Sequence, residues 1–188
     1  SGGDTNGVLG FTIDFTDASG NDGAQVVNTT NSSQVTVDTQ APSLTTVSIA
    51  SNNGTPSNNS ALARAGDVIT LSMTSNEPLL SNPTVNITNA GATDLTVANT
   101  SGNNYEATYT VASSDTNAAV AFTIDYNDLA GNAGAQVVNT TTDSTSVSVD
   151  TDAPGLSSVS IISNNALNTS LAKANDTVTL TFTSDEQL

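Results

Sequence analysis

Apolar and polar residues alternate with a period of two along most of the chain. The alternation is most regular at 177–183, where threonines separate Val178, Leu180 and Phe182. A period of two places successive side chains on opposite faces of a strand, so each such segment predicts a strand with one buried face. In the middle of the chain this pattern predicts strands at 44–49, 68–73, 85–87, 95–97, 105–111 and 120–126, and a long, bulged strand over 137–149.

Turn-forming residues separate these segments, and the helical period of 3.6 residues is nearly absent. Gly, Asn, Asp and Pro stand between the predicted strands at short intervals. Seven short antiparallel strands within about 110 residues are typical of an immunoglobulin-like sandwich. We therefore expect an all-β protein built of immunoglobulin-like antiparallel β-sandwiches.

The chain repeats itself with a period of about 110 residues. Residues 11–30 return at 122–141 with 15 of 20 positions identical, residues 37–53 return at 149–165, and residues 62–79 return at 171–188. This period is too long for a solenoid and fits tandem globular domains. It predicts the C-terminal part of one repeat at 1–38, a complete repeat at 39–149, and the N-terminal part of a third at 150–188.

Neither flanking segment has the residues to close a core alone. We therefore expect the sequence to be an excerpt of a longer repetitive polypeptide. The alternative is that the two flanking segments complement neighbouring chains, although together they lack every counterpart of residues 80–111.

Composition and charge exclude several classes of function. The chain has 18 acidic and 2 basic residues, a formal net charge of −16, and no His, Cys or Trp. It cannot build a His/Cys zinc site, a haem site or an iron–sulfur cluster, and it would repel nucleic acid and anionic membranes. Thr, Ser and Asn together supply 78 of the 188 residues. This neutral polar, β-rich composition favours an extracellular location at the cell surface, with no insertion into a membrane.

Three sequence motifs carry a resemblance to a known family. They are VDTxAP at 37–42 and 149–154, LAKANDTVTLTFTSxE at 171–186, and DxAGN at 128–132. Together they resemble the bacterial Ig-like tandem repeats of giant cell-surface adhesins. The resemblance implies a stalk or adhesive fibre, often with calcium at the joints between repeats.

The positions of the carboxylates also point to the joints. In a sandwich whose first strand begins near 44, the linker residue Asp38 and the loop residues Glu77 and Asp128 fall at one pole of the repeat. Asp4, from the preceding repeat, is expected to face the same joint. The corresponding set at the next joint is Asp115, Asp150, Asp152 and Glu186. Calcium prefers such oxygen ligands, and extracellular modules bind it with dissociation constants of about 10⁻⁴ to 10⁻³ M, so the sequence predicts a calcium site at each joint.

Each of these residues also has a purely structural interpretation. Asp128 and Asn132 are suited to an Asx turn that shapes a tight loop. Asp38 and Asp150 precede Ala-Pro, where proline alone stiffens a linker and leaves the acid solvated. The argument for a ligand is stronger for Glu77 and Glu186, because the chain has only three Glu and two of them occupy the same repeat position.

These observations lead to a mechanical function. We expect a structural repeat of a secreted or surface-anchored adhesin or fibre, in which calcium fixes the joints between neighbouring repeats of one polypeptide. One alternative is a subunit that assembles with copies of itself into an extracellular filament or sheath. A second alternative is a carbohydrate-binding module. An enzyme is not expected, because the Asp38-Thr39 and Asp150-Thr151 pairs lack the glycine of an aspartic-protease triplet and lie in linkers.

Overall fold

The computed structural model describes residues 5–54, 58–93 and 95–186, and within these ranges the fold is all-β with no helix. The strands are β1 (Gly7–Val8), β2 (Thr36–Val37), β3 (Leu44–Ser51), β4 (Leu62–Ala63), β5 (Val68–Ser75), β6 (Thr84–Ile87), β7 (Val97–Ser101), β8 (Asn104–Thr110), β9 (Ala118–Ala119), β10 (Phe122–Asp125), β11 (Val137–Val138), β12 (Ser148–Val149), β13 (Leu156–Ser163) and β14 (Val178–Ser184). Residues 1–150 and 151–188 form two separate compact units.

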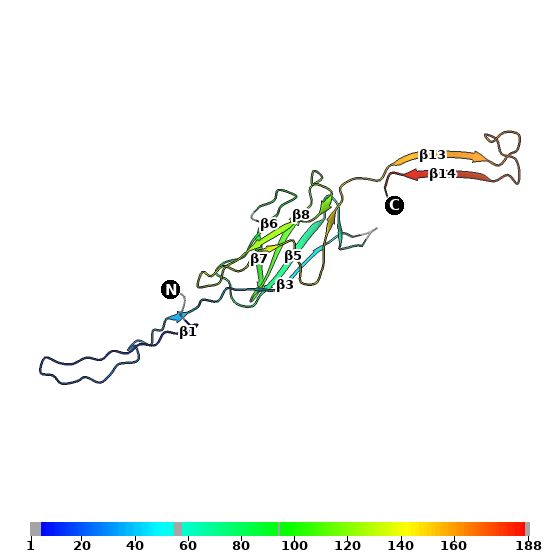
Figure 1. The fold of residues 1–188 in the computed structure, drawn as a ribbon. Coiled ribbons are helices and arrows are strands. Elements are labelled where there is room, and N and C mark those ends of the chain that lie inside the picture. The colour runs from blue at the N-terminus through cyan, green and yellow to red at the C-terminus, as the bar shows by residue number, and fades with distance from the viewer. Residues whose placement is uncertain (1–4, 55–57, 94, 187–188) are drawn as a thin grey trace. The chain divides into compact units, whose positions relative to one another are not determined.

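The largest sheet has four antiparallel strands in the order β3-β5-β8-β7 (Figure 1). Strand β5 alternates between buried and half-buried residues along its whole length, as its period of two predicts. It pairs with β3 on one side and with β8 on the other. The expected strands at 44–49, 68–73 and 105–111 are therefore present.

A second antiparallel sheet, in the order β11-β10-β6, supplies the other half of the core. Val85, Ile87, Phe122 and Ile124 from this sheet are fully or almost fully buried. They belong to the same hydrophobic cluster as residues of β3, β5 and β8. Burial of this apolar surface is the main stabilising term for residues 39–149.

The predicted long strand over 137–149 is divided in two. Strand β11 pairs with β10, whereas β12 joins a separate small sheet, parallel to β4 and antiparallel to β9. The intervening residues contact β3 by one backbone hydrogen bond, from the Thr142 amide to the Val47 carbonyl oxygen at 2.8 Å, and by side chains. The amides of Val47 and Ile49 donate to the hydroxyl oxygens of Thr142 and Thr145, each at 3.0 Å. These hydroxyl groups replace most of a continuous backbone ladder.

Residues 5–37 form a ribbon held by few backbone pairs. Strands β1 and β2 are antiparallel, and isolated bridges join Ile13 to Val26 and Thr16 to Asp22. These pairs reproduce those of the central repeat, where Ile124 pairs with Val137 and Asn127 bridges to Ala133. The apolar side chains of the ribbon are exposed.

The second unit consists of the antiparallel pair β13–β14 and the loop between them (Figure 1). Its apolar side chains are largely exposed. Within the residues that the structure describes, no helix is long and apolar enough to cross a membrane.

Candidate metal centre

Three acidic side chains from distant parts of the sequence lie together at one end of the central repeat. Asp38, Glu77 and Asp128 each place one carboxylate oxygen so that the three oxygens lie within 4.8 Å of one another. Asp128 is only 1% exposed, and the other two residues are half-buried. The structure thus brings together the three residues that the sequence analysis assigned to this pole.

The tight loop after β10 holds Asp128. The Asp128 carboxylate accepts hydrogen bonds from the amides of Ala130 and Asn132, at 2.9 and 2.8 Å, and from the Asn132 side chain at 2.8 Å. Gly131 allows the turn to close, because its φ of 92° is in the region that favours glycine. The Asx-turn interpretation of Asp128 and Asn132 therefore describes this loop correctly.

The environment of Asp128 keeps it ionised. Its burial alone would raise its pKa, but the hydrogen bonds donated by the side chain and amide of Asn132 and by the amides of Ala130 and Gly131 outweigh that effect and hold the pKa below its usual value. A carboxylate oxygen has lone pairs beyond those that accept these hydrogen bonds. Asp128 is thus an ionised, immobilised group that retains the capacity to bind a cation.

The loop after β5 positions Glu77. Asn76 exchanges two hydrogen bonds with Ser43, at 2.8 and 3.0 Å, and the Ser75 hydroxyl donates to the Glu77 carbonyl oxygen. Leu79 bridges to Asp128, which fixes this loop against the loop after β10. Among the described residues, the structure gives the Glu77 carboxylate no hydrogen-bond partner.

Asp38 is held in the linker by its own turn and by two asparagines. Its Oδ1 accepts hydrogen bonds from the Gln40 amide at 3.0 Å and from the Asn6 side chain at 3.2 Å. The Asn132 side chain donates to the carbonyl oxygens of Asp38 and Gln40, at 3.2 and 3.3 Å. Asn132 therefore connects the Asp128 loop directly to the linker.

Sequence reasoning placed Asn132 in the turn at Asp128 but did not predict that its side chain reaches the linker, and it did not identify Asn6 as part of this centre. The sequence carries a weak signal for both, because Asn6 and Asn117 occupy matching positions in two repeats, as do Asn21 and Asn132. With 23 Asn in the chain, such matches do not indicate which asparagines lie at this centre. Only the tertiary arrangement shows that Asn6 and Asn132 do.

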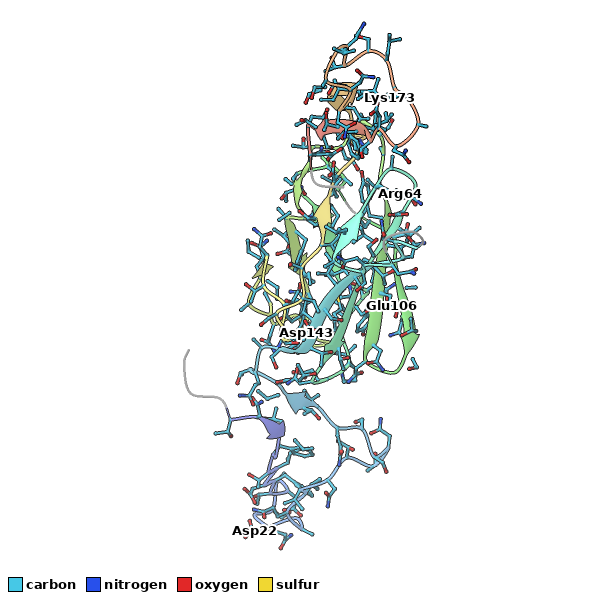
Figure 2. The ribbon with its side chains drawn as sticks, turned by 90° about the vertical axis from the view of Figure 1, so that its right-hand side faces the viewer. Asp22, Arg64, Glu106, Asp143 and Lys173 are labelled. Atoms are coloured by element: carbon cyan, nitrogen blue, oxygen red, sulfur yellow. The ribbon has the colours of Figure 1, made fainter. Side chains whose placement is uncertain are left out.

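The donor set suits a hard cation. All three carboxylates offer oxygen ligands, which calcium and magnesium prefer, and the chain contains no His or Cys to favour a softer metal. Asp38 and Glu77 also line an open pocket of about 670 Å³, which leaves room for water ligands. Of the two basic residues of the chain, Arg64 follows β4 in the first unit, and Lys173 belongs to the second unit, in the loop between β13 and β14 (Figure 2).

The other predicted ligands have different surroundings. Asp4 lies outside the described residues. Asp115 accepts hydrogen bonds from the Tyr109 hydroxyl at 2.7 Å and the Ala112 amide at 2.9 Å. Burial, reinforced by the hydrogen bond to Asp115 and its charge, raises the pKa of Tyr109 to about 12. Asp115 thus shapes its own loop.

The second predicted calcium set is divided between the two compact units. Asp115 and Asp150 belong to the first unit, and Asp152 and Glu186 belong to the second. Asp150 repeats the arrangement at Asp38, since its Oδ1 accepts a hydrogen bond from the Asn117 side chain at 3.0 Å. A calcium site formed by these four residues stays a prediction.

Comparison of this chain with protein-family models, with curated proteins and with solved structures found no match.

Proposed function

We propose that the chain is a structural segment of a secreted or surface-anchored adhesin or fibre, built from tandem immunoglobulin-like repeats whose joints are fixed by calcium. The strand order supports the immunoglobulin-like assignment of residues 39–149. The orders β3-β5-β8-β7 and β11-β10-β6 match the ABED and GFC sheets of a constant-type domain. The internal repeats and the neutral polar composition support a tandem, extracellular arrangement.

The observation that carries the calcium proposal is the convergence of Asp38, Glu77 and Asp128. Asp38 belongs to the linker, whereas Glu77 and Asp128 belong to loops of the following repeat, so a shared cation would attach the linker to that repeat. Without a cation, three carboxylates within 4.8 Å repel one another. Calcium replaces this repulsion with shared coordination and restricts the angle at the joint.

This mechanism makes joint flexibility depend on calcium. Small-angle X-ray scattering of the chain in calcium and in chelator tests this dependence. A restricted joint allows fewer angles between the ribbon and the central repeat, so the longest dimension of the chain should vary less in calcium. The Asp38→Asn variant, which keeps the length and hydrogen-bonding capacity of the side chain, should scatter identically in both conditions. An unchanged profile for the original chain would count against a calcium-dependent joint.

The exposed apolar faces outside the central repeat favour one other candidate, a subunit of a self-assembling filament or sheath. Val8, Phe15, Ile161 and Leu180 are each more than half exposed. Exposed apolar patches of this kind mark sites of association. Electron microscopy of the purified chain separates the two candidates, since a filament subunit forms regular polymers and a stalk segment does not.

A further inference from the structure

Asn53 lies in the loop between β3 and β4, and one hydrogen bond holds its side chain. The side-chain nitrogen Nδ2 donates to Oδ2 of Asp67 at 2.8 Å. The side-chain oxygen Oδ1 is buried and has no hydrogen-bond donor. Buried polar atoms usually have a partner, and Asn53 Oδ1 is the single exception among the described side chains. Rotation of this side chain about its Cα–Cβ bond therefore breaks only one hydrogen bond.

The matching asparagine of the second unit, Asn165, is held by three hydrogen bonds. Its Nδ2 donates to Oδ2 of Asp176 at 3.1 Å. Its Oδ1 accepts hydrogen bonds from the amides of Leu167 and Asn168, at 3.0 and 3.2 Å. The loop that follows Asn53 is longer and supplies no such amides among its described residues. The difference between the two asparagines thus comes from the loop that follows each of them.

The residue after Asn53 is Gly54. A glycine has no Cβ, so its backbone nitrogen can approach the side-chain carbonyl carbon of the preceding asparagine with little steric hindrance. Among the described residues, the Gly54 amide has no hydrogen-bond acceptor that would hold this nitrogen in place. Gly54 is also exposed, so water reaches this part of the backbone. In the second unit, Ala166 takes the place of Gly54.

The other Asn-Gly pair of the chain, Asn6-Gly7, is restrained by the fold. Asn6 Nδ2 donates to Oδ1 of Asp38 at 3.2 Å. Asn6 Oδ1 accepts hydrogen bonds from the amide and the hydroxyl of Thr39, at 2.9 and 2.7 Å. Gly7 belongs to β1, where it pairs with Val37. The two Asn-Gly pairs therefore have the same chemistry and differ in how tightly the fold holds them.

We propose that Asn53 is a site of spontaneous deamidation, with water as the co-reactant. The Gly54 nitrogen forms a bond to the side-chain carbonyl carbon of Asn53, and the bond from that carbon to Nδ2 breaks. Nδ2 leaves as ammonia, with the proton that the Gly54 nitrogen gives up. Water then adds to one of the two carbonyl carbons of the resulting succinimide and opens the ring. The product is aspartate or isoaspartate at position 53, and the net reaction is a hydrolysis with no oxidation or reduction.

The reaction adds a negative charge beside Asp67. In the aspartate product, a carboxylate oxygen replaces the Nδ2 that donated to Asp67. Asp67 Oδ2 also accepts a hydrogen bond from the Arg64 amide at 2.9 Å, which shapes the turn before β5. Two like charges at hydrogen-bonding distance repel each other, so deamidation loosens this turn. The candidate metal centre uses none of these residues, and the proposal does not depend on calcium.

Peptide mapping of the full folded chain, kept in chelator and mildly alkaline buffer, tests the proposal. Endoproteinase Asp-N cleaves before aspartate and places the three asparagines in separate peptides, Asn6 in 4–13, Asn53 in 38–66 and Asn165 in 152–175. Mass spectrometry at successive times follows the replacement of NH₂ by OH, and fragmentation assigns its position. The aspartate product adds a cleavage before residue 53, which distinguishes it from isoaspartate. We expect Asn53 to deamidate at least about 10-fold faster than Asn6, because two fewer hydrogen bonds must break.

Two controls separate the effect of the fold from that of the sequence. In guanidinium chloride the hydrogen bonds of the fold are lost, so the two Asn-Gly pairs should react at the same rate. Gly54→Ala should suppress the reaction at Asn53 and leave the rate at Asn6 unchanged. Alanine fits at position 54, because the φ of Gly54 is outside the left-handed region and an added Cβ would meet, among the described residues, only the Asn52 carbonyl oxygen at 4.0 Å.

Equal rates at Asn6 and Asn53 in the folded chain would overturn the proposal, because the restraints of the fold would then not select the site. Absence of deamidation at Asn53 in the folded chain would also overturn it. So would a Gly54→Ala variant that deamidates at Asn53 as fast as the original chain, because the Gly54 nitrogen would then not be the attacking group.

Discussion

The loops at Asp17 and Asp128 have the same internal structure and different surroundings. Asp17 accepts hydrogen bonds from the amides of Ser19 and Asn21, each at 2.9 Å, and from the Asn21 side chain at 2.8 Å. Asp128 accepts the equivalent three hydrogen bonds in its own loop. Gly20 and Gly131 also have nearly the same φ, 89° and 92°. The turn is therefore determined by its own five residues.

What differs is what lies beside each loop. Asp17 is exposed, whereas Asp128 is buried and close to Glu77 and Asp38. The acidic cluster therefore needs the linker before β3, which holds Asp38, and the loop after β5, which holds Glu77. Neither carboxylate belongs to a cluster with Asp17 among the described residues. A carboxylate that makes a turn becomes a candidate ligand only when tertiary structure brings further carboxylates to it.

Replacing Asp128, the buried carboxylate of the candidate metal centre, should have the largest effect on thermal stability. Asp128→Ala removes a buried side chain and the three hydrogen bonds that its carboxylate accepts, so the Tm of the central repeat in chelator should fall by roughly 10 °C, and calcium binding should disappear. Asp17→Ala removes the same turn from an exposed loop and should leave that Tm within about 1 °C. Calorimetry measures the Tm of both variants. An equal change in Tm would mean that the tertiary surroundings of Asp128 add nothing to the stability that its turn provides.

Calcium binding should have the second-largest effect on thermal stability. A cation that binds only the folded state stabilises it by about 2.7 kcal/mol at 100 times its dissociation constant, which raises the Tm of a domain of this size by roughly 10–20 °C. Glu77→Gln should abolish this rise and should not lower the Tm in chelator, because it relieves repulsion. Glu106→Gln, on β8 (Figure 2), is the matched control and should keep the full rise.

A Tm in chelator that drops for Glu77→Gln would indicate instead that Glu77 has a structural role. A full calcium-dependent rise in this variant would remove Glu77 from the centre. Because the chain has no Trp to report unfolding by intrinsic tryptophan fluorescence, circular dichroism follows the transition.

The asparagine that joins loop and linker should have a smaller effect. Asn132→Ala leaves the three carboxylates in place but removes the donor that contacts the carbonyl oxygens of Asp38 and Gln40. Groups that orient metal ligands typically change affinity by about 10–100-fold, and we expect a loss of about 10-fold here. Asn21→Ala, the same change in the exposed loop, should leave the affinity unchanged. Calcium titration of both variants shows whether the Asn132 side chain orients the metal ligands or only stabilises its own loop.

Acidification should produce the smallest change in Tm. It should weaken the loops at both Asp17 and Asp128. Hydrogen bonds donated within the loop lower the pKa of Asp17, and the same kind of hydrogen bonds outweigh burial to lower that of Asp128. Each ionised group therefore stabilises its loop above about pH 4, and that stabilisation is lost as the pH falls through the lowered pKa.

In chelator, the Tm of the central repeat should fall by a few degrees between about pH 5 and pH 3. Asp128→Asn keeps an oxygen acceptor without a charge and should flatten part of this fall. A pH dependence identical to that of the original chain would contradict the role assigned to the Asp128 charge. Thermal melts across this pH range supply the comparison.

The sequence predicts the strands of the central repeat well because their period of two reflects burial on one face. It does not predict the division of 137–149, since the Thr142 and Thr145 hydroxyls that replace most of the ladder there are indistinguishable by pattern from other surface threonines. The approach of Asp38, Glu77 and Asp128 could be anticipated because loops at one pole of a sandwich are neighbours. The contacts that Asn6 and Asn132 make with the linker residue Asp38 could not be anticipated, because they depend on how loops and linker pack together.

Isothermal titration of calcium into the chelator-stripped chain tests the central claim most directly. The account predicts saturable binding with a dissociation constant of about 10⁻⁴ to 10⁻³ M, abolished by Glu77→Gln and retained by Glu106→Gln. Absence of binding at millimolar calcium, or the same binding in both variants, would contradict it.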